Sequence, residues 1–291
     1  MIKKVLRVIF SCILTLFIAI VVLAGSLCYF AEQTVCDPDI LVQTAESSGF
    51  AEELYQEIKY DWENLLAITG VMKPDDMMAV LTQEQVQTDA IAYIRDSYTG
   101  SATVDTAQIR RQLDEKVREY AYSHNINATP ESELEQNIKD LVDACMAEYR
   151  SSITIPLLPK LLGAVTTYSA YLQTGKTITA VAAAVLLLFL FFLQVQRRDT
   201  LYYLTLAAAT DGIILVGLVQ AATYYDVINR IPFDASALKT LLCHYLQSIL
   251  NSLQGFGMQF GIITGILLAA YLLLCILVAI VKAILKARKT A

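Results

Sequence analysis

The sequence is poor in the residues and motifs that enzymes most often use. It contains only two histidines, His124 and His244, and neither lies in a metal-binding pattern. The zinc-protease, nucleophile-elbow, phosphate-loop, dinucleotide-binding and CxxC motifs are also missing. These absences predict a protein that is not an enzyme and that needs no metal or cofactor. The enzyme alternative would require a cleft lined by converging carboxylates, which a sequence alone does not reveal.

Charged residues are scarce too. They make up 17% of the 291 residues, whereas 56% are hydrophobic and the mean hydropathy is +0.50. This balance is too apolar for an ordinary soluble domain. Runs of alternating Val, Ile or Thr are lacking, so little or no β-sheet is expected. The composition therefore predicts an all-α membrane protein.

The apolar residues gather in four blocks. Each is long enough to cross a hydrocarbon core of about 30 Å, which takes about 20 helical residues. The predicted transmembrane helices are residues 8–31, 177–196, 200–225 and 258–281. The lipid bilayer is thus the first predicted partner.

The first block has two interpretations. Its basic start, its apolar run and the small residues at 24–26 resemble a secretory signal peptide. The apolar run is longer than the roughly 7–15 residues of such a signal, which favours an uncleaved anchor. Cleavage would remove one span and leave the sidedness of the others unchanged.

Three basic clusters predict the orientation. They lie in the N-terminal segment 1–7, in the link 197–199 and in the tail 282–291, and the only acid among them is Asp199. By the positive-inside rule all three segments are cytoplasmic. The prediction is a multi-pass protein of the cell membrane with both termini in the cytoplasm. Two loops, 32–175 and 226–256, then lie outside.

The first outer loop is acidic, with 24 Asp and Glu against 10 Lys and Arg in residues 32–175. Such a surface repels nucleic acid, so no nucleic-acid partner is expected. Apolar stripes at helical spacing predict four main helices that close one core. The stripes are Leu54, Ile58, Trp62 and Leu65; Val86, Ala90, Tyr93 and Ser97; Ile109, Leu113, Val117 and Tyr120; and Leu134, Ile138, Leu141, Cys145 and Tyr149.

Capping patterns mark where these helices begin. Asp37-Pro38 and Thr129-Pro130 pair an N-cap with a proline at the first helical position, and Thr82 with Gln85 forms a capping box. A separate apolar helix over 161–172 is expected to lead into the second span. In the second outer loop, residues 237–253 form an amphipathic pattern suited to the membrane interface.

The cysteines allow more than one arrangement. Three of the six, Cys36, Cys145 and Cys243, fall outside the spans, in a compartment that permits disulfides. Cys145 lies on an apolar stripe, which predicts a buried thiol. A Cys36–Cys243 disulfide would join the two outer loops, and the sequence leaves this pairing open.

Asp211 is the only charged residue inside a predicted span. Counted from Thr200 at 1.5 Å per residue it lies ~16 Å deep, near the midplane, where an acid costs about 2.5–3.5 kcal/mol. The same count from Lys282 places Tyr271 at this depth, and Thr15 lies within about two turns of it. The favoured interpretation is a protonated Asp211 that hydrogen-bonds Tyr271 or Thr15. A proton or cation relay, and docking to another membrane protein, are the alternatives.

Glycines in the fourth span predict a close helix contact. Gly257, Gly261 and Gly265 are four residues apart and share one helix face. The third span offers a matching small face at Ala208 and Gly212 beside Asp211. We therefore expect these two spans to pack together through small residues.

Together these patterns predict a non-catalytic surface interaction, scaffold or sensing subunit that acts through its acidic outer domain. Its expected partner is another membrane or surface protein, and a homo-oligomer is compatible with the sequence. The alternative is a small transporter or channel subunit that uses Asp211. An Asp211 that lines an axis would favour transport, whereas a dry contact within the chain would weaken it.

Overall fold

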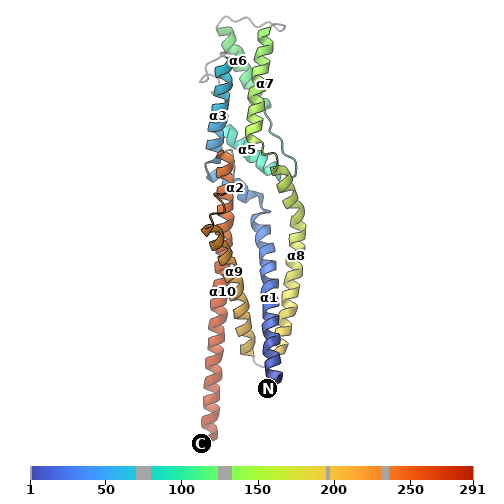
Figure 1. Cartoon of the computed structure of the whole chain (residues 1–291), viewed down its shortest axis with the longest axis vertical. Coiled ribbons are helices and arrows are strands. Elements are labelled where there is room, and N and C mark those ends of the chain that lie inside the picture. The colour runs from blue at the N-terminus through green and yellow to red at the C-terminus, as the bar shows by residue number, and fades with distance from the viewer. Residues whose placement is uncertain (1, 70–79, 124–132, 195–196, 231–235, 291) are drawn as a thin grey trace. The chain divides into compact units, whose positions relative to one another are not determined.

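The computed structural model describes residues 2–69, 80–123, 133–194, 197–230 and 236–290, and these residues form α-helices joined by turns and loops, with no β-strand among them (Figure 1). This confirms the all-α prediction. The helices are α1 (Ile2–Thr34), α2 (Pro38–Ser47), α3 (Phe50–Thr69), α5 (Gln83–Ser97), α6 (Ala107–Ser123), α7 (Glu133–Ile153), α8 (Leu158–Leu193), α9 (Arg197–Tyr224) and α10 (Ser236–Thr290).

Four helical stretches are long and apolar enough to cross a membrane, as predicted. They lie in α1, α8, α9 and α10. Each exposes large apolar side chains, such as Phe17 (54% exposed), Phe192 (80%), Ile213 (73%) and Leu273 (62%). Apolar surface of this extent is rare on soluble monomers and is the surface that lipid covers. The chain is therefore of the multi-pass membrane class.

The chain divides into two compact units. The apolar unit comprises residues 1–35, 169–230 and 247–291, and the polar unit comprises residues 36–168 and 231–246. The predicted helix over 161–172 is the first part of α8, which continues without a break through the second span.

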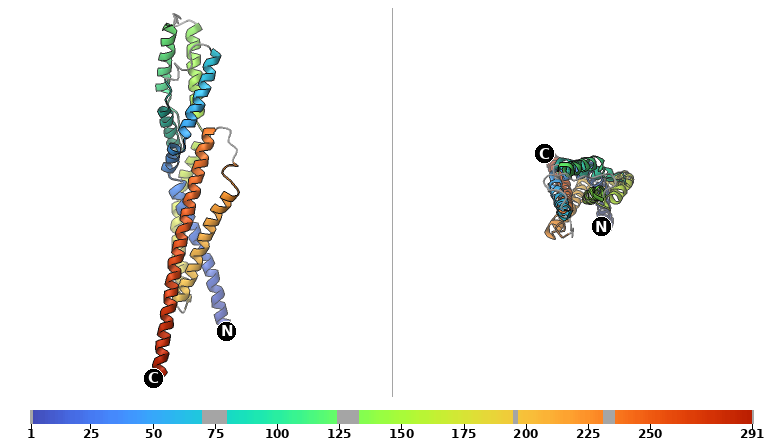
Figure 2. Two further views of the ribbon diagram at one scale, coloured as in Figure 1. Left: turned by 90° about the vertical axis from the view of Figure 1, so that its left-hand side faces the viewer. Right: turned by 90° about the horizontal axis from the view of Figure 1, so that it is seen from above.

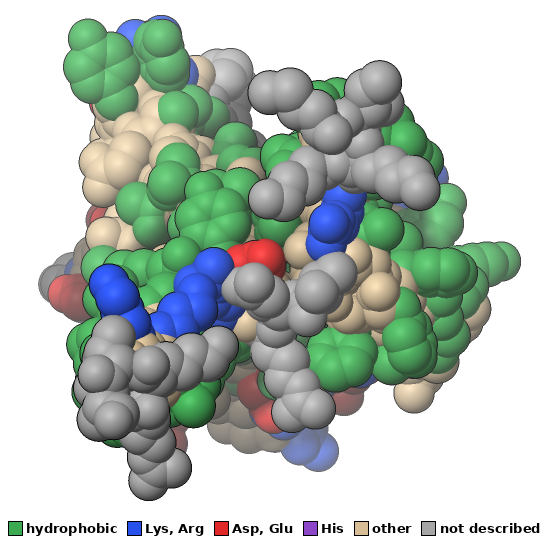
Figure 3. Space-filling view, turned by 90° about the horizontal axis from the view of Figure 1, so that it is seen from below, with side chains coloured by type: hydrophobic (Ala, Val, Ile, Leu, Met, Phe, Trp, Pro, Cys, Tyr) green, Lys and Arg blue, Asp and Glu red, His purple; other side chains and the backbone are tan. Residues whose placement is uncertain are grey.

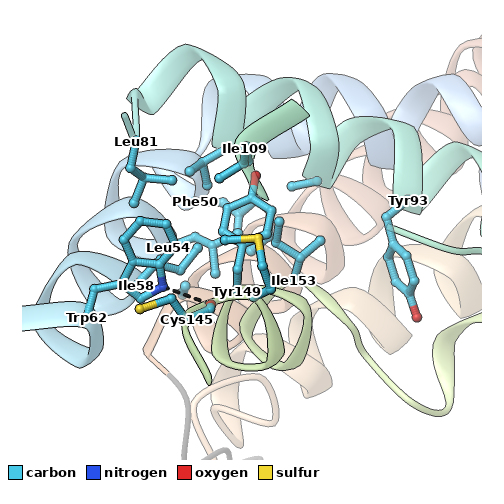
Figure 4. Packing of buried hydrophobic residues seen from close by; sticks show 14 of the residues in the cluster. Phe50, Leu54, Ile58, Trp62, Leu81, Tyr93, Ile109, Cys145, Tyr149 and Ile153 are labelled. Atoms are coloured by element: carbon cyan, nitrogen blue, oxygen red, sulfur yellow. Dashed lines mark hydrogen bonds between the residues drawn. The ribbon is translucent and has the colours of Figure 1, made fainter. Parts of the chain in front are cut away.

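The polar unit has its own hydrophobic core, in which the four predicted stripes meet (Figure 4). Trp62 on α3 is fully buried, and its Nε1 donates a hydrogen bond to the Cys145 carbonyl on α7 at 3.1 Å. The Cys145 side chain is buried as predicted, and burial raises the pKa of its thiol to about 12. The Tyr149 hydroxyl donates to Asp89 at 2.6 Å, which satisfies the polar end of another buried ring.

Two of the predicted helix starts are confirmed. Asp37 caps α2, with Pro38 at its first position, and the Thr82 side chain caps α5 by accepting from the Gln85 amide at 3.2 Å. Gly49 and Gly100 adopt φ angles of 78° and 83°, a left-handed conformation that suits glycine. The third predicted start, Thr129-Pro130, lies outside the described residues.

Within the apolar unit, α1 packs against α8 and α9 through a small core of Ile18, Ala19, Leu190, Tyr203 and Ala207. At one end of the α1–α8 pair, Lys176 forms an ion pair with Glu32. At the other end, Gln194 Nε2 donates to Ser11 Oγ at 2.6 Å. Polar contacts thus fix both ends of this helix pair, where the surroundings become less apolar.

Two predicted boundaries differ from the structure. Arg197–Asp199, expected as a link, form the first turn of α9. The segment 237–253, expected as a separate helix in the membrane interface, is the first part of α10, which runs unbroken to Thr290 (Figure 2). Ala237 and Leu241, each 1% exposed, lie in the core of the polar unit. Burial against protein accounts for the apolar face that suggested a membrane surface.

Candidate functional site

Asp211 is buried inside the apolar unit. Its residue is 1% exposed, and neither carboxyl oxygen has a hydrogen-bond partner among the described residues. An ionised carboxylate without a partner is very costly in such surroundings, whereas the protonated acid is far less so. The geometry therefore favours a neutral Asp211.

The residues predicted to bind Asp211 lie elsewhere. Thr15 is buried, but its hydroxyl donates to the Ser11 carbonyl one turn earlier in α1, at 2.7 Å. The Tyr271 ring packs against the ring of Tyr202, with 5.9 Å between centroids. The structure does not bring either hydroxyl to Asp211, so the predicted hydrogen bond is replaced by these contacts.

The register of α9 against α10 explains the difference. A Cβ atom placed on Gly212 would lie 3.3 Å from Phe260 Cβ and 3.5 Å from the Gly257 carbonyl oxygen. Tyr271 comes ten residues after Gly261, about 15 Å farther along α10, and Tyr202 comes ten residues before Gly212. An antiparallel pair in this register aligns Tyr271 with Tyr202 and not with Asp211.

Small residues form the closest part of the α9–α10 contact. A Cβ on Gly257 would lie 2.9 Å from Val216 Cγ2 and 3.2 Å from Leu215 Cβ, closer than side chains tolerate. Ala208 is also buried. A Cβ on Gly261 or Gly265 would have no described atom within 4 Å. Gly212 and Gly257 are therefore the residues that need to be small. The backbone of Gly261 also faces Gly212, because a Cβ on Gly212 would lie 3.6 Å from the Gly261 nitrogen, and all three glycines line an open apolar groove.

The polar unit contains a second feature of interest, a groove of about 450 Å³ between α5 and α6. We call it the α5–α6 groove. Its lining residues are Val80, Thr82, Gln85, Gln108, Gln112, Glu115, Lys116 and Glu119. Amide and carboxylate groups dominate this lining, and Lys116 forms an ion pair with Glu119 at 2.8 Å. The groove thus offers hydrogen-bond acceptors to a cationic or polar ligand.

The basic residues of the polar unit are largely engaged with its own acids. Arg118 makes two hydrogen bonds of 2.7 Å to the two carboxylate oxygens of Glu135, which lower the pKa of that acid. Arg110 pairs with Asp143, and Lys59 with Glu63. Several exposed acids have no ion pair among the described residues; they include Glu46, Glu52, Glu84, Asp96, Asp105 and Glu115. The surface charge that remains is therefore negative.

Cys36 and Cys243 are both partly exposed thiols in the polar unit. The Cys36 thiol donates to the Val165 carbonyl at 3.9 Å. Their pairing under oxidising conditions stays a prediction. In the described part of the chain, no group of three or more His, Cys, Asp or Glu residues could hold a metal ion.

Comparison of the chain with protein-family models, with curated proteins and with solved structures finds no match. The sequence singles out Asp211 and the small residues of α9 and α10, but it does not indicate the α5–α6 groove. The signal for that groove was weak, because glutamines and glutamates on the solvent side of a helix are common.

Proposed function

We propose that this protein is a non-catalytic interaction subunit of the cell membrane that binds another protein through its polar unit. In this proposal both termini are cytoplasmic and the polar unit lies outside. The observation that carries it is a helical unit with its own core, in which most basic residues pair with acids of the unit while several exposed acids have no ion pair among the described residues. A surface of this kind steers and orients a basic partner.

The α5–α6 groove is the proposed contact point. Glu115 and Glu119 lie one turn apart on α6 and line the groove beside three glutamines. Carboxylates and amides together suit a Lys- or Arg-containing segment of a membrane or surface protein, because charge-assisted hydrogen bonds are stronger than neutral ones.

The transport alternative has less support from the geometry. Asp211 is 1% exposed and lines neither the open groove between α9 and α10 nor the cavity between α1, α9 and α10. A group that relays ions needs a path of polar atoms or water. A buried carboxyl group that lines neither opening is better suited to a structural role.

The proposal is tested by photocrosslinking the full-length protein in intact cells. A photoreactive amino acid at Gln112, in the groove, should give a crosslinked partner, and one at Tyr60 on α3 should not. Glu115→Gln with Glu119→Gln should abolish the adduct. Glu46→Gln with Glu52→Gln, an equal charge change away from the groove, should preserve it. An adduct that survives the groove variant, or that consists only of a second copy of the chain, would overturn the proposal.

A further inference from the structure

A cavity of about 720 Å³ opens between α1, α9 and α10, at the end of the apolar unit where α1 and α9 begin. Its polar lining includes Arg7, Ser11, Arg198, Asp199, Tyr202 and Tyr271. Seen from this end, Lys and Arg side chains flank an acidic side chain (Figure 3). The volume is typical of sites that hold small molecules.

Hydrogen bonds and ring contacts hold the cavity wall. Ser11 is completely buried; its hydroxyl donates to the Arg7 carbonyl at 2.9 Å and accepts from Gln194 at 2.6 Å. On the opposite wall, the Tyr202 ring packs against both Tyr203 and Tyr271. These contacts fix the positions of the groups that line the cavity without using the charge of either arginine.

The charges that face the cavity are unequal. Arg198 Nε lies 3.4 Å from Asp199 Oδ1, and its two terminal nitrogens make no hydrogen bond to the described residues. With Arg7 on α1, two guanidinium groups thus face one carboxylate. Among the described side chains that line the cavity, one further negative charge would balance the two guanidinium groups. Guanidinium groups favour phosphate, because their parallel N–H groups match its oxygens.

The remaining lining is apolar and exposed. Val5, Val8 and Ile9 border the same cavity and are at least half exposed. A free phosphate ion would make no favourable contact with these apolar side chains, whereas the acyl chains of a lipid would cover them. The cavity also lies where the apolar spans give way to basic residues, which is the depth of lipid headgroups.

We propose that this cavity binds the phosphate headgroup of an anionic phospholipid from the surrounding leaflet. Arg7 and Arg198 bind the phosphate oxygens, Tyr202 supplies a hydroxyl donor, and the acyl chains lie against the exposed face of α1. The site is distinct from the groove proposed to bind a protein, and it does not depend on which side of the membrane this end occupies.

Native mass spectrometry of the full-length protein in neutral detergent tests the proposal. One phosphatidylglycerol should bind per chain, with an apparent affinity about tenfold above that of phosphatidylcholine. Arg198→Gln should lower that affinity roughly tenfold, the loss expected for a hydrogen bond to a charged group. Lys282→Gln is the matched control, because Lys282 is an exposed base of α10 outside the cavity, and it should bind like the wild type.

Tyr202→Phe keeps the ring contacts with Tyr203 and Tyr271 and removes one hydroxyl, so it provides a second test if Arg198→Gln does not fold. A loss of about threefold is expected for a neutral hydrogen bond. Equal binding of the two lipids, equal losses in Arg198→Gln and Lys282→Gln, or no loss in Tyr202→Phe would overturn the proposal. Inorganic phosphate that displaces phosphatidylglycerol at equal concentration would also contradict it, because the site would then bind a free anion.

Discussion

Tyr202 and Tyr271 lie ring against ring, with centroids 5.9 Å apart, and this contact reports the register of the antiparallel helices α9 and α10. The same register brings Gly212 of α9 against Gly257 of α10. Each glycine is at least ten residues along its helix from the tyrosine of that helix. Asp211, next to Gly212, therefore lies beside a helix contact made by small residues and far from the Tyr271 hydroxyl. This alignment thus determines both the surroundings of Asp211 and the positions at which α9 and α10 need small residues.

The glycine contact predicts opposite effects for two equal substitutions. Gly257→Ala should destabilise the detergent-solubilised protein by about 1–3 kcal/mol, because the added Cβ would lie 2.9 Å from Val216 Cγ2. Gly261→Ala places its Cβ where no described atom lies within 4 Å, and replaces a helical glycine, so it should be neutral or slightly stabilising. Thermal melts of the two variants check this. Equal melting temperatures would show that the helices do not meet at Gly257.

The buried carboxyl group of Asp211 predicts tolerance of uncharged residues. Because it has no hydrogen-bond partner among the described residues, Asp211→Asn should fold normally. Asp211→Leu should match or exceed the wild-type stability, by up to about 1–3 kcal/mol, because it removes an unsatisfied polar group. The measurement is a thermal melt together with crosslinking from Gln112. A stable Asp211→Leu protein that no longer crosslinks would assign Asp211 a functional role.

The core of the polar unit predicts a large difference between two aromatic residues of α3. Trp62→Ala removes a fully buried ring and its hydrogen bond to Cys145, at a cost of about 3–5 kcal/mol. Tyr60 is 65% exposed, so Tyr60→Ala should change stability by less than about 0.5 kcal/mol. Chemical denaturation followed by circular dichroism compares them. A mild effect of Trp62→Ala would contradict the packing in Figure 4.

The Arg118–Glu135 pair predicts acid sensitivity. Hydrogen bonds from Arg118 lower the pKa of Glu135 below its ordinary value of about 4.3. The stabilisation is therefore complete above that value and is lost as pH falls through the lowered pKa. Trp62 is the only tryptophan, so its fluorescence reports unfolding of this unit between pH 5 and about 3. Glu135→Gln should make the free energy of unfolding less dependent on pH in this range. Asp140→Asn, at an exposed site of α7, should leave that pH dependence unchanged.

Local features of the fold could be predicted from the sequence. The apolar stripes identify the buried faces of α3, α5, α6 and α7, because helical spacing alone places Trp62 or Leu113 on one side of its helix. The caps at Asp37 and Thr82 are set by neighbouring residues, so they too could be read directly.

Longer-range features could not be predicted. Helical spacing shows that a helix face is apolar but not what covers it. The sequence places Ala237 and Leu241 in the membrane interface, whereas the structure buries them in the hydrophobic core of the polar unit. The depth of Tyr271 was counted from Lys282, which assumes that the first basic residue marks the end of the span. The contact at Gly257 fixes the true alignment, and it depends on two helices at once.

Binding of a surface partner requires that the polar unit lie outside the cell. A single cysteine at Ser47, an exposed position in the polar unit, and one at Thr290 near the C-terminus can be compared in a chain whose six native cysteines are replaced by alanine. An impermeant thiol reagent applied to intact cells should label the cysteine at position 47 and spare that at position 290 until the membrane is permeabilised. Labelling at position 290 but not at position 47 would place the polar unit in the cytoplasm and contradict the proposed function.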